Sequence, residues 1–367
     1  MSKPLTLATQ TTFAELSDRC MDAQFDADFD ERGTFLTKRL KRGDYWYYQR
    51  WQNGAPVQTY VGPKRDDAIT KRVETFKDRI KPDFSQRKEM VRTLIASGLP
   101  QPDPTTGRVV EALWKAGFFR LRGILIGTTA YQCYGGVLRR RFAGAAMRTA
   151  DADFAQYLAI SREVKDSLPP MNEVLSAVDT TFTPIMDSLD GRHVVAFRNK
   201  DGYRVEFLTP HRGASHRAST PVRMPALGGV SAIQLPYLDF LLRDPIRSVM
   251  LHGAGVPVTV PSPARYAIHK LIVATQRMPS SSAKRGKDIA QAAELIKAIG
   301  EEHLDEDLIL AWTEAWDRGP KWRVALATGR AALPGAAQES LDLSASIAVA
   351  MSGNAISPSD YGLEGPL

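Results

Sequence analysis

The stretch "MRTADADFAQ" at residues 147–156 holds Asp151 and Asp153, separated by one alanine, behind an Arg-Thr pair. Side chains alternate between the two faces of a β-strand, so a strand here points both carboxylates the same way. Two carboxylates this close repel each other unless a cation lies between them. The stretch by itself fits either a metal site for phosphate chemistry or an ordinary polar turn, and the flanking sequence has to distinguish the two.

The flanking segments on both sides have the pattern of strands. Upstream, "RLRGILIGTTAYQCY" predicts a short apolar strand over residues 121–126, a Gly127-Thr128 turn and then a helix. Downstream, "HVVAFRNKDGYRVEFLTP" at residues 193–210 predicts two strands joined by the turn "NKDG". Arg204 and Glu206 share one face of the second strand, so Glu206 can stand beside the aspartate pair.

The turn, the aspartate pair and Glu206 together are the features that phosphoryl or nucleotidyl transfer uses. Carboxylates hold Mg²⁺ ions that neutralise the charge of a triphosphate. A small-residue turn at a helix start lets backbone N–H groups approach phosphate oxygens. A third carboxylate helps to activate the attacking hydroxyl. Each piece alone is a common surface feature, but their order along the chain, on predicted strands, favours this chemistry.

The motifs "GTTAYQCY", "RTADADF" and "YRVEFLTP" resemble the nucleotidyltransferase fold of the DNA polymerase β-like superfamily. The resemblance is closest in style to AbiEii-type toxins and to a neighbouring, uncharacterised bacterial nucleotidyltransferase family. It implies an α+β fold: a mixed sheet core with helices, an N-terminal β-hairpin and helical module, and a helical C-terminal region.

The resemblance also assigns roles to individual residues. It implies that three acids are the catalytic residues and the ligands of Mg²⁺ (or Mn²⁺): Asp151, Asp153 and Glu206. It implies that NTP, the substrate, is held by the following residues: Gly127, Thr128, Arg148, Thr149, Lys270 and Arg277. The departures from the family pattern are a long loop between the turn and the acids, and a glutamate where aspartate is commoner as third acid.

The downstream part of the resemblance lies in "RYAIHKLIVATQR" and "KRGKDIAQAAELI". Lys270 and Arg277 are seven positions apart and so share one face of a predicted helix, where they are implied to point at the nucleotide. A cationic face over a triphosphate offsets charge during transfer. The alternative is a solvated helix face. Lys287 and Asp288 are implied to open the next helix, although Asp288 also suits a helix N-terminus without any catalytic role.

Two other features of the sequence each allow two interpretations. The Arg139–Arg141 run lies in the long loop and either grips phosphates of a nucleic-acid acceptor or forms a solvated charge cluster. His269 beside Lys270 either faces the site or is a core histidine.

The length of 367 residues favours about two or three domains. We expect an N-terminal helix plus β-meander module (1–100), a nucleotidyltransferase core (101–229), a mostly helical domain (230–330) and a loosely ordered tail (331–367). The meander, "GTFLTKRLKRGDYWYYQRWQNGAPVQTYVGP", interleaves aromatic and basic residues. They either stack on nucleic-acid bases or pack on neighbouring helices.

Composition narrows the class of protein. A net charge of +7 and a pI near 9.3 suit a polyanionic substrate such as a nucleotide or RNA. Two isolated cysteines, Cys20 and Cys133, argue against a zinc or disulfide framework and favour a reducing cytoplasm. No apolar run is long enough to cross a bilayer, so we expect a soluble, cytoplasmic protein without a membrane partner.

The sequence therefore favours a Mg-dependent nucleotidyltransferase that moves an NMP from an NTP to an acceptor hydroxyl, with RNA or tRNA as the candidate acceptor. One alternative is a catalytically inactive nucleotide- or RNA-binding module, against which the three intact acids count. Another is the toxin of a toxin–antitoxin pair, with the same chemistry and a cognate antitoxin as partner.

Overall fold

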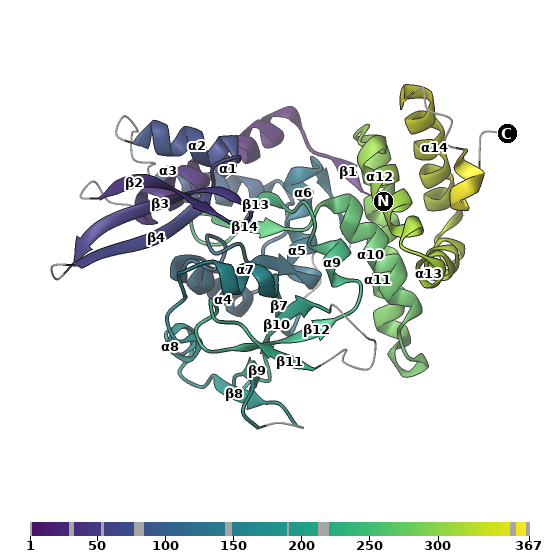
Figure 1. The fold of residues 1–367 in the computed structure, drawn as a ribbon. Helices are drawn as coiled ribbons and strands as arrows, with labels where there is room; N and C mark the ends of the chain where they lie inside the picture. The colour runs from purple at the N-terminus through teal and green to yellow at the C-terminus, as the bar shows by residue number, and fades with distance from the viewer. Residues whose placement is uncertain are drawn as a thin grey trace.

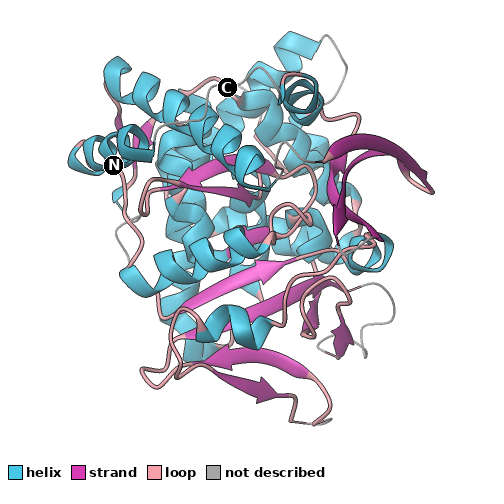
Figure 2. Ribbon diagram, turned by 90° about the vertical axis from the view of Figure 1, so that its left-hand side faces the viewer, coloured by secondary structure: helices cyan, strands magenta, loops and turns pink. Residues whose placement is uncertain are grey.

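The computed structural model describes residues 2–28, 33–52, 55–76, 84–143, 149–188, 191–211, 220–352 and 357–364. A seven-stranded mixed sheet forms the lower part of the molecule as drawn in Figures 1 and 2, and most of the helices lie above it. The strand order is β11-β12-β10-β7-β5, and β9 pairs with both β10 and β8. The strands are β5 (Ile124–Ile126), β7 (Asp151–Ala155), β8 (Thr183–Met186), β9 (Val194–Arg198), β10 (Arg204–Pro210), β11 (Pro221–Arg223) and β12 (Ser231–Leu235).

The alternation of side chains along β7 and β10 sets the faces of this sheet. Ala152 and Phe154 are buried, as are their neighbours Val205 and Phe207, and the two phenylalanine rings stack with centroids 5.9 Å apart. Intervening positions face the other way, which confirms the predicted strand faces of the acids. The predicted strand before Gly127 begins later than expected, at Ile124, because the chain still turns through Arg122 at φ 64°.

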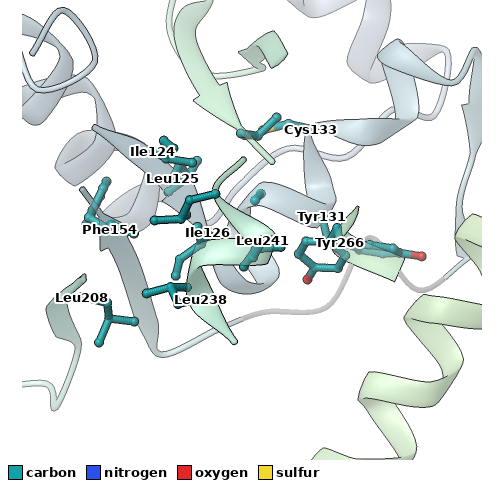
Figure 3. Close-up of a cluster of buried hydrophobic side chains, with 14 of the residues drawn as sticks. Ile124, Leu125, Ile126, Tyr131, Cys133, Phe154, Leu208, Leu238, Leu241 and Tyr266 are labelled. Carbon is teal, nitrogen blue, oxygen red and sulfur yellow. The ribbon is translucent and has the colours of Figure 1, made fainter. Parts of the chain in front are cut away.

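The helices in this part of the chain are α4 (Pro104–Ala116), α5 (Gly127–Gln132), α6 (Tyr134–Val137), α7 (Leu158–Glu163), α8 (Met171–Ser176) and α9 (Leu238–Leu241). Of these, α5 packs on β5 and β7, and α9 packs on β10. Asp103 caps α4 by accepting hydrogen bonds from the backbone N–H groups of Thr105 and Thr106. Figure 3 shows the resulting core, in which β5 and Phe154 of β7 lie among buried side chains of α9 and α10.

The C-terminal region is a stack of helices: α10 (Pro263–Thr275), α11 (Ser282–Glu301), α12 (Asp305–Asp317), α13 (Pro320–Ala331) and α14 (Gly335–Ser352). The expectation of a loosely ordered tail is wrong over the described part of residues 331–367. Leu341 of α14 is fully buried and Leu363 beyond it is nearly so, because α14 packs against α11 and α12. Apolar residues at helical spacing therefore outweigh the Ala- and Ser-rich composition.

The N-terminal region contains a three-stranded antiparallel sheet in the order β2-β3-β4, which confirms the predicted meander. Its elements are β1 (Lys3–Pro4), α1 (Leu7–Asp28), β2 (Thr34–Leu40), β3 (Gly43–Gln52), β4 (Ala55–Pro63), α2 (Asp67–Glu74) and α3 (Phe84–Ala96). Tyr45, Tyr47 and Tyr60 are buried in the main core, as the packing interpretation expects, whereas Trp51 is exposed.

Two further strand pairs join distant parts of the chain. The hairpin β13 (Ile246–Met250) and β14 (Val256–Val260) packs beside β5 and α1, and β1 pairs with β6 (Arg140–Arg141). The largest apolar cluster runs from Tyr45 to Leu363, so the N-terminal sheet shares its core with the rest of the described chain. The division into four segments at residues 100, 229 and 330 stays a prediction. No helix among the described residues is long and apolar enough to span a membrane.

Candidate active site

The Gly127 turn and the aspartate pair converge despite the long loop between them. Ile126 at the end of β5 pairs with Asp153 of β7, and Gly127 follows with φ 68°, in the left-handed region. A Cβ atom at Gly127 would lie 2.5 Å from Oδ2 of Asp153, so glycine is required both for the turn and for the close approach of the acid. The Tyr266 hydroxyl of α10 lies 3.0 Å from the Gly127 carbonyl oxygen and anchors the turn.

The three predicted acids lie on neighbouring strands in matching register. In the parallel pair β7–β10, Asp153 is opposite Glu206 and Asp151 is opposite Arg204. The backbone therefore brings the acids to one face and one end of the sheet, as the sequence predicts.

The acidic side chains themselves point to separate partners. An Arg204 guanidinium N–H donates to Glu206 at 2.7 Å, and the Thr149 hydroxyl donates to Asp151. No three His, Cys, Asp or Glu side chains in the described part of the chain are gathered into a metal-ligand set. The predicted three-acid cluster is thus present in the strand register, while Glu206 is turned towards Arg204.

Asp153 is the most constrained of these acids. Burial raises the pKa of its carboxyl to about 7, and the neighbouring charges of Asp151 and Glu206 act in the same direction. Lys270 and Lys284 oppose the rise. Without a cation between them, like charges on adjacent strands thus favour a protonated Asp153 near neutral pH.

The cationic residues from the C-terminal helices meet on one buried carboxylate. Lys270 Nζ lies 2.6 Å from one oxygen of Asp288 and Arg277 Nε lies 3.0 Å from the other, with only 3% of the Asp288 side chain exposed. The prediction that Lys270 and Arg277 share a helix face is wrong, because α10 ends at Thr275 and Arg277 follows it. Asp288 brings them together instead.

The Lys287-Asp288 pair does not open a helix either, since α11 begins at Ser282. Two lysines of this first stretch of α11 nevertheless interact electrostatically with the acids. Lys284 acts on the pKa of Asp153, and the charge of Asp151 acts on the pKa of Lys287, which burial lowers overall. Lys284 was not predicted to belong to the site. The basic run "KRGK" at residues 284–287 is the signal in the sequence, but only the fold turns it towards β7.

The loop between the turn and the acids is fastened by α11. Glu294 accepts hydrogen bonds from the Tyr131 hydroxyl at 2.5 Å and from the Ala143 backbone N–H at 2.8 Å. Arg140 is buried and forms ion pairs with Glu301 at 2.5 Å and Glu302 at 3.2 Å. Both interpretations of the arginine run are therefore wrong for Arg140, whereas its two neighbours in the run are exposed. The predicted site residue Arg148 lies outside the described residues.

His269 is half-buried and interacts electrostatically with Lys270, Asp288 and Arg277. Burial and the nearby Lys270 charge lower the pKa of its imidazole to about 3, so the ring is neutral at physiological pH.

Comparison with known proteins places the chain within a family. A family model described as "Nucleotidyltransferase" matches residues 104–317, more than half of the chain. A solved structure, described as an antigenic nucleotidyltransferase-like protein from Paracoccidioides brasiliensis, is 16% identical, with a TM-score of 0.30, over 62% of this chain and 94% of that chain. No curated protein matches the chain. The special likeness to AbiEii-type toxins stays an expectation. The matched residues run from α4 to α12 and include β5, β7, β10, α10 and α11, and the chain belongs to this nucleotidyltransferase family.

Proposed function

We propose that this nucleotidyltransferase moves an NMP from an NTP to an acceptor hydroxyl, with Asp151, Asp153 and Glu206 as the catalytic acids. The observation that carries the proposal is the packing of Gly127 against Asp153 while Asp153 stands opposite Glu206. A tight turn, a buried acid and a second acid on the next strand thus meet at one end of the sheet. This is the arrangement that nucleotidyl transfer requires of a protein.

The donor set suits Mg²⁺ or Mn²⁺ in its chemistry. All three side chains offer carboxylate oxygens, which hard divalent cations prefer. The raised pKa of Asp153 supports the same assignment, because a cation beside three acids replaces the proton that their repulsion otherwise retains. To bind the cation, the Glu206 carboxylate must first break its ion pair with Arg204. A bound cation would neutralise triphosphate charge and activate the acceptor hydroxyl.

The remaining residues have roles towards the triphosphate and the acids. The backbone N–H groups of Gly127 and Thr128 can approach phosphate oxygens, since no Cβ covers the turn at Gly127. Lys270, Lys284 and Lys287 would offset the negative charge of the triphosphate. Thr149 orients Asp151, Arg277 acts through Asp288, and Arg148 stays a prediction. Glu206, once released from Arg204, is placed to accept the hydroxyl proton.

The proposed acceptor is an RNA hydroxyl, with a tRNA 3′ end as one candidate. The net charge of +7 and the exposed Arg139 and Arg141 support a polyanionic acceptor. A toxin restrained by a cognate antitoxin would use the same chemistry. Growth arrest on expression of the wild type, and not of Asp151→Ala, would extend the proposal to that role.

The test is transfer of label from each α-phosphate-labelled NTP in the presence of Mg²⁺, with and without total RNA. We expect label on an acceptor with the wild type and with Asp307→Ala, a matched control in which an exposed acid of α12 is removed. Asp151→Ala should lower the rate at least 100-fold. The proposal fails if no acceptor is labelled, or if Asp151→Ala labels as well as the control. Thermal stabilisation by NTP that survives Asp153→Ala, without any transfer, would indicate the binding-module alternative.

A further inference from the structure

A cavity separate from the candidate active site lies between the N-terminal sheet and the core. It has a volume of about 600 Å³ and is lined by the end of β4 and α2, by residues 119–124, and by β13 and β14. Ile124 at the start of β5 lines this cavity, whereas Ile126 at the other end of β5 pairs with Asp153. The acids and lysines of the candidate site do not line it. The two sites therefore lie at opposite ends of one short strand.

Positive charge dominates the lining of this arginine-lined cavity. Its charged residues are Arg65, Arg72, Arg120, Arg122 and Arg247, against Asp66 and Asp244. The five guanidinium groups come from three separate parts of the chain, so the fold and not a local basic run assembles them. Guanidinium groups bind phosphate through paired N–H donors, which makes a phosphate the matching anion.

Two of these arginines are held by protein partners, and two others have no such partner in the part of the chain that the structure describes. Arg120 donates to Asp166 at 2.6 Å and to the Tyr60 carbonyl oxygen at 2.8 Å, and Arg247 donates to Asp66 at 2.6 Å. Arg65 and Arg122 form no ion pair or side-chain hydrogen bond with any described residue.

The placement of Arg122 is unusual. Its backbone has φ 64°, a conformation that residues other than glycine rarely adopt, and its side chain is only partly exposed. Its guanidinium is thus held at the cavity without an acid to neutralise it. Strained positions of this kind persist where the surrounding structure holds them, and they cluster at binding sites.

The rest of the lining is apolar. Val61, Phe119, Tyr157, Leu242 and Val258 form much of the wall. An inorganic anion alone would leave this surface exposed to water, whereas a ligand with an apolar or planar part would cover it. The volume lies within the range of about 300–1,000 Å³ that is usual for small-molecule sites.

We infer that this cavity binds a phosphorylated compound of mononucleotide size, with its phosphate on Arg65 and Arg122 and its planar part against Phe119 and Tyr157. The site goes beyond the proposed transfer reaction, because it uses none of the residues assigned to that reaction. A free nucleotide and the terminal nucleotide of an RNA both carry a phosphate next to a planar base. A competition experiment distinguishes these two sources of the ligand.

The test measures binding of AMP to the full-length chain carrying Asp151→Ala and Asp153→Ala, without divalent cations, so that the candidate active site is disabled. We expect saturable binding of AMP, with adenosine and inorganic phosphate each at least tenfold weaker. Adding Arg122→Ala should weaken AMP binding at least tenfold. The matched control Arg223→Ala removes an exposed arginine of β11, at the opposite edge of the central sheet, and should stay within twofold.

Displacement of AMP by a 5′-phosphorylated RNA trinucleotide would identify an RNA end as the source of the ligand, and failure to displace it would identify a free nucleotide. The inference is overturned if the folded double variant does not bind AMP, if adenosine binds as tightly, or if Arg122→Ala equals Arg223→Ala. Should Arg122→Ala not fold, Arg65→Ala at an exposed position takes its place. Label transfer is measured separately with the wild-type chain. A negative result for AMP binding at this cavity is therefore distinguishable from a negative result for the proposed transfer reaction.

Discussion

A buried carboxyl group beside two others keeps its proton until a cation replaces it, and Asp153 is in this position. Its pKa of about 7 results first from burial and then from the charges of Asp151 and Glu206. The folded chain thus holds a proton that the unfolded chain, with a carboxyl pKa near 4, releases. Stability from this group is present below pH 4 and is lost as the pH rises towards 7.

Replacing Asp153 with asparagine should therefore stabilise the protein in a pH-dependent way. In the presence of a chelator, we expect Asp153→Asn to raise the free energy of unfolding by about 2–4 kcal/mol at pH 8, and by clearly less at pH 5. Urea unfolding at the two pH values measures the difference. Asp307→Asn is the matched control and should be unchanged. Equal stabilisation at both pH values would contradict the electrostatic explanation. Mg²⁺ should raise the stability of the wild type at pH 8 and not that of Asp153→Asn.

Substitutions at Gly127 and Gly202 can separate the cost of a positive φ from the cost of a steric clash with Asp153. Both have positive φ, 68° and 82°, but a Cβ at Gly202 meets nothing within 4 Å, whereas one at Gly127 meets Asp153. We expect Gly202→Ala to cost about 1–2 kcal/mol of stability and to retain label transfer. Gly127→Ala should lower kcat/KM for transfer at least 100-fold, because Asp153 must move. Similar activities of the two variants would refute the assigned contact.

At the scale of elements, α10 and α11 are joined across the candidate site by one acid. Asp288 of α11 binds Lys270 of α10 and Arg277 just beyond it, and its side chain is almost fully buried. A buried carboxylate with two cationic partners cannot be removed without leaving their charges unpaired.

Loss of this acid should affect both folding and nucleotide binding. We expect Asp288→Ala to destabilise the protein by about 2–4 kcal/mol and to raise the KM for NTP at least tenfold, since Lys270 loses its position near Asp153. The control is Asp342→Ala, which breaks an ion pair with Arg330 of 2.6 Å between α14 and α13. This variant should lose stability with little change in KM. Equal changes in KM would mean that Asp288 acts only through overall stability.

Strand patterns in the sequence predict more of the site than helix patterns do. Period-two alternation in "DADFA" and "YRVEFLTP" places Asp151, Asp153 and Glu206 on the correct face, because the apolar residues between them must be buried. The helical pattern at residues 265–277 extends past Thr275 and so places Arg277 on the wrong element. Lys284 cannot be assigned from sequence, since its approach to Asp153 depends on the packing of α11 against α10.

At the scale of the whole molecule, the N-terminal sheet is fastened to the core through Asp166. This acid accepts from Arg120 and from the Tyr60 backbone N–H of β4 at 3.3 Å. Tyr45, Tyr47 and Tyr60 of the sheet belong to the main core. The arginine-lined cavity lies along the same junction.

Removing this link should loosen the junction without unfolding the rest of the chain. We expect Asp166→Ala to cost about 1–3 kcal/mol and to speed amide hydrogen exchange in β4 more than in β7 or β10. The control is Glu163→Ala, which breaks a longer ion pair of 3.3 Å with the exposed Arg42 and should cost less than about 1 kcal/mol. Uniform acceleration of exchange across all strands would contradict a local role for Asp166.

The overall arrangement follows only in part from the sequence. The α+β class, the meander and the mixed sheet around the acids are predicted from local patterns. The sharing of one core by the meander and the C-terminal helices is not, because it joins residues that lie far apart in the chain, such as Tyr47 of β3 and Leu271 of α10, in one apolar cluster. The same holds for the arginine-lined cavity, whose charged groups no local motif brings together.

The pairing of β1 with β6 has a consequence for synthesis on the ribosome. Lys3 and Pro4 pair with Arg141 and Arg140, and α1 packs against β13 and β14, so residues 3–28 find the last of these partners only after residue 260 has been synthesised. Contacts of such long range form late and slow folding. Apolar side chains of α1 such as Leu16, which is buried in the folded chain, therefore stay uncovered over this interval and are expected to engage chaperones during translation.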